Sequence, residues 1–244
     1  MKIHHELVHW GRRNLGCWDI SPPWMSCYID GCSQNFHSDV PHGPWAFVLS
    51  LSPWETDPNK RKFTGGNTMI LKPEILNYWQ NFSRMNDREA DGILDLIEPK
   101  MNRLVVFDPR YPHGVQEVHG SKDPREGRLV IHGWFTLPKT YIEGSLAVSM
   151  SKHQHTENVL NTGFQLLQEA LTHYSEMIQG ALSLELQINA NGDCTKTQFL
   201  TFNAIDDRGQ KSVQLKKEIL AIYKSLKFAK SKGKTTAVVP LLFE

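Results

Sequence analysis

The stretch Gln34-Asn35-Phe36-His37-Ser38-Asp39 places an imidazole and a carboxylate two residues apart. On a β-strand, successive side chains alternate between the two faces, so His37 and Asp39 are expected to project into the same space. They would supply two of the three ligands of a facial metal site, in which two histidines and one carboxylate bind one side of an ion and leave the opposite positions open. The pair therefore predicts a third ligand elsewhere in the chain.

His113 is the candidate for this third ligand. It follows Pro112 at the start of an apolar run, and strands that are distant in sequence become neighbours in a double-sheet β fold. A single histidine among the 11 in this chain is more often structural than a ligand. The order of the elements favours His113 as the third ligand, because it follows the His-x-Asp pair and precedes an arginine that opens the next strand.

Arg128 opens the apolar stretch 128–135. A guanidinium is always charged and offers a forked set of donors that matches a carboxylate, so Arg128 in a sheet core would need an anion. One alternative is a surface salt bridge with Glu126 or Asp123. Another is that Arg125 binds the anion instead. Arg128 is preferred because it begins the apolar strand.

Short apolar runs separated by Gly, Pro and polar turns fill much of the first 136 residues. Many short strands favour a mainly β fold of two packed sheets, a jelly roll, with residues 45–51 buried on both faces. Residues 1–26 are interpreted as irregular structure around a short strand or helix, and residues 74–98 as a helix or loop between strands. The expected strands are 25–29, 34–39, 45–51, 67–71, 103–107, 113–118 and 128–135.

After Pro138 the pattern changes. Residues 149–157 are polar and are interpreted as a linker, so we expect a jelly-roll domain over residues 1–148 and a small α+β domain over residues 156–244. The second domain is expected to contain a helix at 159–178, a hairpin at 182–202 with Asn191-Gly192 at its turn, a helix at 213–228 and a strand at 237–243.

Composition sets bounds on function. The formal net charge is +1, with acids and bases mixed along the chain, so neither nucleic acid nor a membrane surface is an expected partner. The N-terminus lacks the apolar segment of a secretory signal, and the four cysteines show no paired zinc spacing. Reduced cysteines in a cytoplasmic protein are the simpler interpretation, with Cys27 and Cys32 as metal ligands the alternative.

Several motifs between residues 24 and 136 occur in a fixed order. They are Tyr28, His37-Ser38-Asp39, the strand 46–51, Gly65-Gly66-Asn67-Thr68-Met69-Ile70-Leu71, the strand 102–107, Pro112-His113-Gly114-Val115 and the stretch 127–135. This ordered set resembles the iron(II)- and 2-oxoglutarate-dependent dioxygenases, in particular the prolyl-hydroxylase-like branch.

The resemblance implies a double-stranded β-helix in which His37, Asp39 and His113 bind Fe(2+). It also implies that Arg128 binds the distal carboxylate of 2-oxoglutarate and that Tyr28 lines the cosubstrate pocket. O2 would be the second cosubstrate, with ascorbate (vitamin C) as an accessory reductant. Because related halogenases replace the carboxylate to admit a halide, Asp39 favours hydroxylation, or another oxidation that begins with hydrogen abstraction, over halogenation.

The implied reaction is hydroxylation of an amino-acid or peptidyl substrate, with prolyl suggested by analogy, and release of succinate and CO2. The substrate is expected to be a small molecule, a peptide or a protein, with contacts from the loops 54–64 and 81–99. Two other interpretations stay open. They are a non-catalytic cupin-like domain that binds a metal or small acid, and a zinc hydrolase, for which no recognised general base accompanies the His-x-Asp pair.

The C-terminal part loosely resembles the small C-terminal domains of TonB-type proteins. That resemblance implies an accessory module that binds a protein partner. The alternative is that this part only buttresses the first domain.

Overall fold

The computed structural model describes residues 2–39, 42–53, 55, 57–73 and 90–243. The contacts of the chain divide it into two compact units, one formed by Ile20–Thr136 and the other by Met1–Asp19 together with Leu137–Glu244. The expected helix or loop at 74–98 lies largely outside the described residues. Within the described part of the chain, no helix combines the length and the apolar character needed to cross a bilayer.

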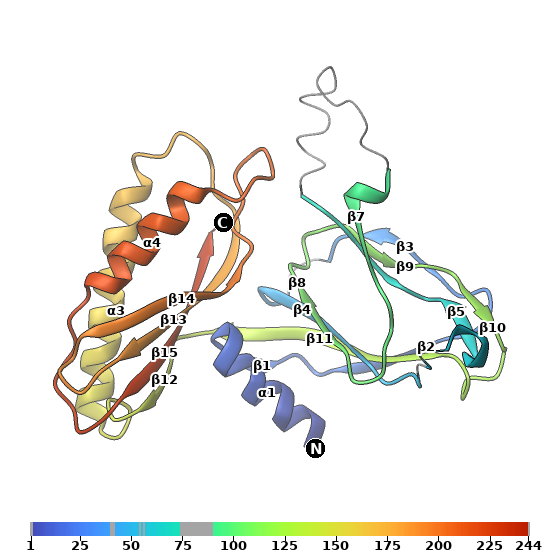
Figure 1. Cartoon of the computed structure of the whole chain (residues 1–244), viewed down its shortest axis with the longest axis horizontal. Coiled ribbons are helices and arrows are strands. Elements are labelled where there is room, and N and C mark those ends of the chain that lie inside the picture. The colour runs from blue at the N-terminus through green and yellow to red at the C-terminus, as the bar shows by residue number, and fades with distance from the viewer. Residues whose placement is uncertain (1, 40–41, 54, 56, 74–89, 244) are drawn as a thin grey trace. The chain divides into compact units, whose positions relative to one another are not determined.

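The unit Ile20–Thr136 is a mainly β, jelly-roll-like fold of antiparallel sheets (Figure 1). One sheet has the order β1-β11-β4-β8, with β2 also paired to β11, and the other has the order β3-β9-β6-β7. Strands β5 and β10 form a two-stranded ribbon. The strands are β1 (Cys17–Ile20), β2 (Trp24–Tyr28), β3 (Gln34–His37), β4 (Trp45–Ser50), β5 (Phe63–Gly65), β6 (Thr68–Leu71), β7 (Leu94–Ile97), β8 (Leu104–Phe107), β9 (His113–Val115), β10 (Val118–Gly120) and β11 (Arg128–Pro138), with short 3-10 helices at Pro58–Lys60 and Ala90–Ile93.

A hydrophobic cluster between the two sheets forms the core of this unit. Ala46, Phe107 and Trp134 come from the first sheet, and Ile70 comes from the second. The expectation that residues 45–51 form a buried strand is confirmed for β4, in which every residue but Val48 is buried. Close packing between the two sheets fixes the positions of the strand ends, and these ends carry the polar residues of the candidate metal site.

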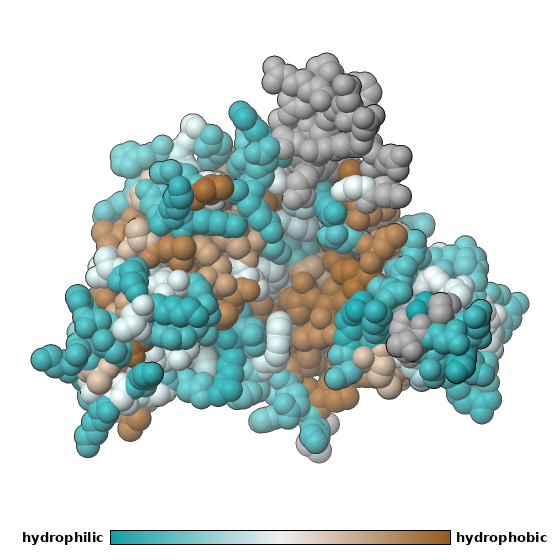
Figure 2. Space-filling model, viewed as in Figure 1, coloured by the Kyte–Doolittle hydropathy of each residue, from teal (hydrophilic) through white to brown (hydrophobic). Residues whose placement is uncertain are grey.

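The first sheet also carries apolar side chains at the surface. In Figure 2, hydrophobic residues gather in the region where Figure 1 labels β4 and β8. Leu104 and Val106 on β8 are only partly buried, and Met25 on β2 is 65% exposed. Some apolar residues of these strands therefore lie at the surface and are not part of the core between the sheets.

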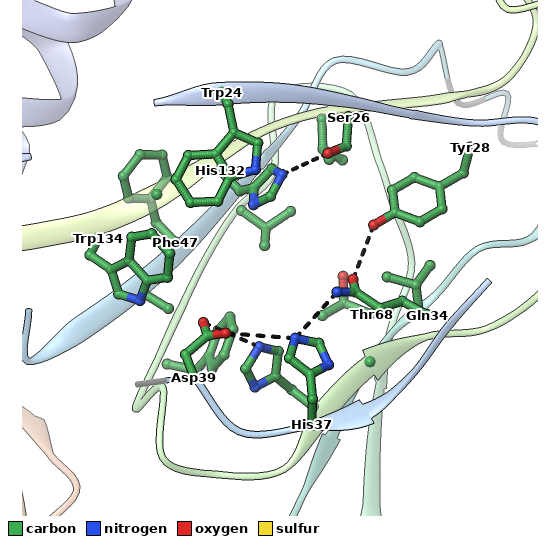
Figure 3. Close-up of a pocket in the computed structure, with 18 of the residues that line it drawn as sticks. Trp24, Ser26, Tyr28, Gln34, His37, Asp39, Phe47, Thr68, His132 and Trp134 are labelled. Atoms are coloured by element: carbon green, nitrogen blue, oxygen red, sulfur yellow. Dashed lines mark hydrogen bonds and ion pairs between the residues drawn. The ribbon is translucent and has the colours of Figure 1, made fainter. Parts of the chain in front are cut away.

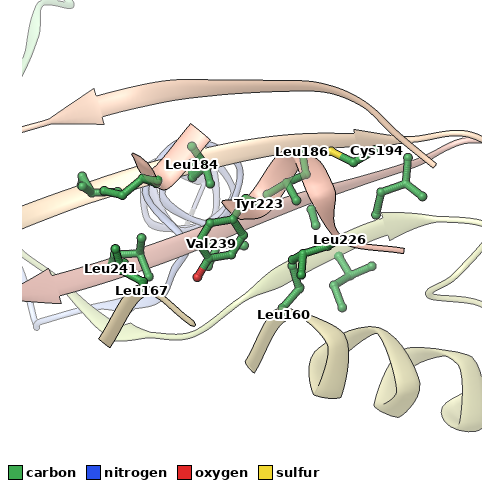
Figure 4. Close-up of a cluster of buried hydrophobic side chains, with 14 of the residues drawn as sticks. Leu160, Leu167, Leu184, Leu186, Cys194, Tyr223, Leu226, Val239 and Leu241 are labelled. Carbon is green, nitrogen blue, oxygen red and sulfur yellow. The ribbon is translucent and has the colours of Figure 1, made fainter. Parts of the chain in front are cut away.

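The second unit is an α+β fold with one four-stranded sheet of order β12-β15-β13-β14 (Figure 1). A core cluster joins this sheet to two helices, α3 and α4, and includes Leu160, Leu184 and Tyr223 (Figure 4). The elements are α1 (Lys2–Leu15), β12 (Tyr141–Gly144), α3 (Met150–Leu171), β13 (Gly180–Ile188), β14 (Cys194–Phe202), α4 (Val213–Ser225) and β15 (Thr235–Phe243).

Helix α1 covers the face of this sheet that α3 and α4 leave free. Leu182 and Leu184 of β13 pack in the cluster with α3 and α4, whereas Ser183 between them donates a 3.0 Å hydrogen bond to the carbonyl oxygen of Leu15. Successive side chains of a strand point to opposite faces, so the two helical layers lie on opposite sides of the sheet. Leu15 is fully buried in this position.

Helix α1 corrects the expectation of mainly irregular structure at the N-terminus. Residues 2–15 are helical rather than irregular, and residues 1–19 group with 137–244 instead of with the jelly roll. The buried positions Leu7, Val8, Gly11 and Leu15 have helical spacing, which explains why α1 presents one apolar face. This spacing is a sequence signal for a helix with one apolar face, and the expectation of a 1–148 domain did not take it into account.

The linker expected at 149–157 is also wrong. Ser149 caps α3, and its side chain accepts a hydrogen bond from the backbone N–H of Lys152. Thr156 is fully buried and donates to the carbonyl oxygen of Lys152. The polar composition of this segment therefore reflects the first turns of an amphipathic helix.

Candidate metal centre

His37, Asp39 and His113 form a cluster at the ends of two neighbouring strands. Their potential ligand atoms all lie within 4.8 Å of one another. One Asp39 oxygen lies 3.7 Å from His37 Nε2, and the other lies 3.6 Å from His113 Nε2. His37 ends β3 and His113 begins β9, and the two are paired in register. The structure thus brings together all three predicted ligands.

The way in which Asp39 joins His37 differs from the expectation. Strand β3 ends at His37, so the two side chains do not share a strand face. The backbone N–H of Asp39 instead donates a 3.0 Å hydrogen bond to the carbonyl oxygen of Pro109. This bond fixes the segment after β3 beside the chain that leads into β9. Loop backbone, and not strand alternation, therefore positions the carboxylate.

Both imidazoles are oriented by hydrogen bonds on the ring nitrogen that faces away from the cluster. His37 Nδ1 lies 2.9 Å from the carbonyl oxygen of Asn35, and His113 Nδ1 lies 2.9 Å from that of Tyr111. Such bonds place the proton on Nδ1 and leave Nε2 as a metal ligand. Burial lowers the pKa of His113, which favours the neutral imidazole that a metal needs.

The donor set fits a metal of the non-haem iron type. Two imidazoles and one carboxylate on one side of an ion form the facial triad of Fe(II) oxygenases. The four cysteines are free, and within the described residues this triad is the only cluster of metal-ligating side chains. The alternative of Cys27 and Cys32 as metal ligands therefore has no support in the structure.

Arg128 lies in the same cavity as the His/Asp/His cluster. It is a buried cation, and one of its N–H donors is unused. It is 1% exposed, and its Nη2 donates a 3.0 Å hydrogen bond to Thr68 Oγ1. Its Nε is buried without a hydrogen-bond partner among the described residues. Burial lowers the pKa of Arg128 to about 10, which still leaves it charged at neutral pH. A buried charge with a free donor is costly unless an anion binds there.

The contacts of the neighbouring charged residues bear on the alternatives for the arginine. Arg125 is largely exposed and forms a 2.5 Å ion pair with Asp123 outside the cavity. Glu126 pairs with Lys62 at 3.3 Å, so neither acidic neighbour neutralises Arg128. The preference for Arg128 as the arginine of the cavity agrees with these contacts.

Tyr28 is paired in register with Arg128 across β2 and β11. The guanidinium carbon of Arg128 lies 4.9 Å from the centroid of the tyrosine ring. The Tyr28 hydroxyl donates a 3.1 Å hydrogen bond to Gln34 Oε1, and Gln34 Nε2 lies 3.3 Å from His37 Nε2. Tyr28 and Gln34 therefore connect the arginine to the metal cluster along one wall (Figure 3).

The cavity has a volume of about 300 Å3 and contains residues that the sequence interpretation missed. Figure 3 shows Trp24, Ser26 and His132 on the side of the pocket opposite His37 and Asp39. Strand alternation could have identified these residues. If Tyr28 and Arg128 face the pocket, every second residue of β2 and β11 faces it too. The missed lining residues include Trp24, Ser26, Gln34, Thr68, His132 and Trp134.

The fold and the site together define a double-stranded β-helix with a facial His/Asp/His cluster and a buried arginine in the same cavity. Residues 23–136 match the family model described as the 2OG-Fe(II) oxygenase superfamily. This part of the chain is therefore a 2OG-Fe(II) oxygenase domain, of a family that uses Fe(2+), 2-oxoglutarate and O2.

The solved structures similar to this chain include two prolyl hydroxylases. A prolyl-4-hydroxylase from Pseudomonas putida is 22% identical with a TM-score of 0.32, and the match covers 50% of this chain and 54% of that one. A prolyl hydroxylase from Trichoplax adhaerens, in complex with a hypoxia-inducible factor oxygen degradation domain peptide fragment, is 19% identical with a TM-score of 0.31 and coverage of 48% and 46%. The chain thus spans about half the length of these structures. No curated protein matches the chain.

Proposed function

We propose that this chain is an Fe(II)- and 2-oxoglutarate-dependent oxygenase that hydroxylates an amino-acid or peptidyl substrate and releases succinate and CO2. The observation that carries the proposal is the presence, in one cavity, of the His37/Asp39/His113 cluster and of Arg128 with an unpaired buried donor. A metal site alone suits many reactions. A metal site that shares a pocket with a buried cation suits a cosubstrate with an anionic end.

In this proposal His37, Asp39 and His113 hold the iron through two Nε2 atoms and one carboxylate. Bound iron and 2-oxoglutarate supply the activation of O2 and the oxidation of a substrate C–H bond. The protein fixes the three ligands on one side, so the other coordination positions stay open to cosubstrates. The hydrogen bonds to the carbonyl oxygens of Asn35 and Tyr111 keep both imidazoles in that geometry.

Arg128 binds the distal carboxylate of 2-oxoglutarate in this proposal. Thr68 holds one guanidinium nitrogen, and the unpaired Nε leaves a buried donor available to an anion. Tyr28 lines the same part of the pocket and packs its ring against the guanidinium. A carboxylate at this position would satisfy the unpaired donor and would neutralise the buried charge.

The test is binding of the cosubstrate and its dependence on metal. Protein freed of metal under anaerobic conditions is titrated with radiolabelled 2-oxoglutarate, with and without Mn(II) as a redox-inert stand-in for Fe(II). We expect saturable binding that Mn(II) strengthens, and succinate formation when Fe(II), O2 and ascorbate are supplied. Protein that binds neither Mn(II) nor 2-oxoglutarate would refute the proposal.

The Asp39→Ala variant separates the oxygenase from a non-catalytic cupin-like binding domain. The oxygenase is expected to lose metal binding and succinate formation together. A domain that binds a small acid without turnover would keep acid binding and would form no succinate in the parent protein. Metal analysis of protein purified without oxygen addresses the zinc hydrolase, which would retain zinc and ignore 2-oxoglutarate.

The finer parts of the proposal concern substrate, partner and location. A prolyl residue is proposed as the oxidised group by analogy with the prolyl-hydroxylase branch. The unit formed by Met1–Asp19 and Leu137–Glu244 is proposed as an accessory module for a protein partner. The four free cysteines support a reducing compartment such as the cytoplasm.

A further inference from the structure

A histidine that the proposed chemistry does not use lies on the pocket wall. His132 stands on β11 four residues after Arg128, and both side chains line the cavity. At about 3.3 Å per residue, the two positions are about 13 Å apart along the strand. The strand therefore presents a cation at one end of the pocket and an imidazole at the other. A ligand bound to Arg128 leaves His132 free to contact a second molecule.

Two contacts fix the orientation of His132. Its Nε2 lies 2.7 Å from Ser26 Oγ, and its ring centroid lies 4.4 Å from that of Trp24 in an edge-to-face arrangement. Ser26 and Trp24 are two residues apart on β2, so strand alternation places both on the pocket side. Among the described residues, Ser26 is the only hydrogen-bond partner of this imidazole, and Figure 3 shows the other ring nitrogen turned away from Ser26.

The imidazole of His132 is neutral at pH 7 in the folded protein. Burial, with a smaller contribution from the positive charge of Arg128, lowers its pKa to about 4. A neutral imidazole carries one N–H donor and one acceptor. With Nε2 engaged by Ser26, Nδ1 remains as a hydrogen-bonding group without formal charge. The Ser26 hydroxyl can serve as either donor or acceptor, and it therefore permits either tautomer.

The charges of the pocket limit what can bind beside His132. Among the described lining residues, Asp39 and Arg128 are the only ones with a carboxylate, ammonium or guanidinium group. The proposed function assigns the first to the metal and the second to 2-oxoglutarate. A free amino acid would bring an ammonium and a carboxylate with no remaining counter-charge, and burying an unpaired charge is costly.

We propose that the pocket recognises its substrate through His132, which Ser26 and Trp24 orient. The part of the substrate that enters the pocket is uncharged and carries an amide or hydroxyl beside the oxidised carbon. The inference rests on the proposed oxygenase function. An amide or hydroxyl offers both a donor and an acceptor, so it suits Nδ1 in either tautomer. Ser26 acts as a positioning residue, since its hydroxyl is engaged by Nε2 of His132.

The substrate class is tested with matched probes. N-acetyl methylamides of the proteinogenic amino acids and the corresponding free amino acids are compared for their stimulation of succinate release above the substrate-free background. We expect the best capped amide to exceed its free amino acid by at least about tenfold in kcat/KM, because the free form must bury its charges. Equal or stronger stimulation by free amino acids, or no stimulation by any capped amide, overturns the inference.

Three variants test His132 itself. The side-chain amide of His132→Asn keeps a polar atom near the position of Nδ1, whereas His132→Gln keeps one near Nε2 and His132→Phe keeps neither. We expect the Asn variant to retain recognition within about fivefold and the Gln and Phe variants to lose at least about tenfold in kcat/KM. A structural role through Ser26 gives the opposite order, with the Gln variant retaining activity and the Asn variant losing it.

Two controls separate this inference from the proposed function. His119→Phe changes a largely exposed histidine on β10 and is expected to leave kcat/KM unchanged. Binding of 2-oxoglutarate in the presence of Mn(II) is measured for each variant and should stay within about threefold of the parent protein, because His132 and Arg128 are about 13 Å apart along β11 and His132 has no direct contact with the cosubstrate in this proposal. A parent protein that binds no 2-oxoglutarate defeats the proposed function. Normal binding with unchanged turnover in His132→Phe defeats only the role of His132.

Discussion

His37 and His113 face each other as register partners across β3 and β9, with ring centroids 4.4 Å apart. The pairing places two imidazoles at adjacent strand ends in one sheet, and Asp39 closes the cluster from the chain after β3. Strand pairing therefore determines the spacing of the two histidines, whereas loop backbone determines the position of the carboxylate.

Replacing Asp39 with Ala should weaken metal binding by at least about a hundredfold, since losing a ligand exceeds the 10–100-fold effect of losing an outer-shell partner. The measurement is Mn(II) affinity from the electron paramagnetic resonance signal of free Mn(II). Asp95→Ala is the matched control, because Asp95 is an exposed carboxylate on β7 that pairs with Lys72. Unchanged Mn(II) affinity in Asp39→Ala would show that the cluster is not the metal site.

Replacing Arg128 with Met should weaken 2-oxoglutarate binding by more than about a hundredfold, because two charge-assisted hydrogen bonds of about 1.5–3 kcal/mol each are lost. Stability of the ligand-free protein should stay level or rise, because the substitution removes a buried charge with an unpaired Nε. Calorimetric titration and thermal unfolding measure the two effects. The exposed Arg125→Ala serves as control, and loss of stability without loss of binding would contradict the role of Arg128.

Thr68→Val should have a smaller effect on the same binding. The variant removes the hydroxyl that accepts the 3.0 Å hydrogen bond from Arg128 but keeps the shape of the side chain. We expect a loss of about 1 kcal/mol, or about five- to tenfold in the dissociation constant for 2-oxoglutarate. A loss as large as that of Arg128→Met would mean that Thr68 contacts the cosubstrate itself.

The stability of the metal-free protein should fall as the pH drops from about 6.5 towards 4. Above the ordinary histidine pKa of about 6.5, His132 is neutral in both the folded and unfolded states and contributes no pH dependence. Its folded pKa is lowered to about 4, so below pH 6.5 the unfolded state takes up a proton first and is favoured. The pKa of His113 is lowered in the same direction by burial.

The measurement is the melting temperature of metal-free protein at pH 7.5 and pH 5. The difference between the two should be smaller for His132→Asn than for the parent protein, because one titrating group is gone. His119→Asn is the control, since His119 is largely exposed. An equal pH dependence in His132→Asn and the parent protein would show that His132 does not titrate as its burial requires.

Gly16→Ala should destabilise the second unit by about 2–5 kcal/mol. Gly16 has φ of +68°, and an added Cβ would lie 2.7 Å from Cδ of Pro240. The substitution therefore combines left-handed strain of about 1–2 kcal/mol with overpacking of about 1–3 kcal/mol. Gly31→Ala has a similar φ of +81° with open space around the Cβ, so it should cost only the strain. Urea unfolding measures both, and equal effects would exclude the Pro240 contact.

Much of the site could be predicted from the order of residue types along the chain. His37, Asp39, His113 and Arg128 share one pocket, as the ordered motifs indicated. The sequence alone does not distinguish His132, because a lone histidine in an apolar strand resembles any core histidine. It becomes meaningful only once β2 is placed beside β11, which brings Ser26 to its Nε2.

The sequence by itself determined the mainly β character of residues 24–136, the α+β character of the C-terminal part and the residue types of the metal cluster, because apolar periodicity and ligand chemistry are local properties. Only the tertiary structure decided where those residues meet. The hydrogen bond from Asp39 to Pro109 and the packing of α1 on the C-terminal sheet join segments that are distant along the chain. Such contacts depend on backbone geometry and close packing across long separations, which no local pattern encodes.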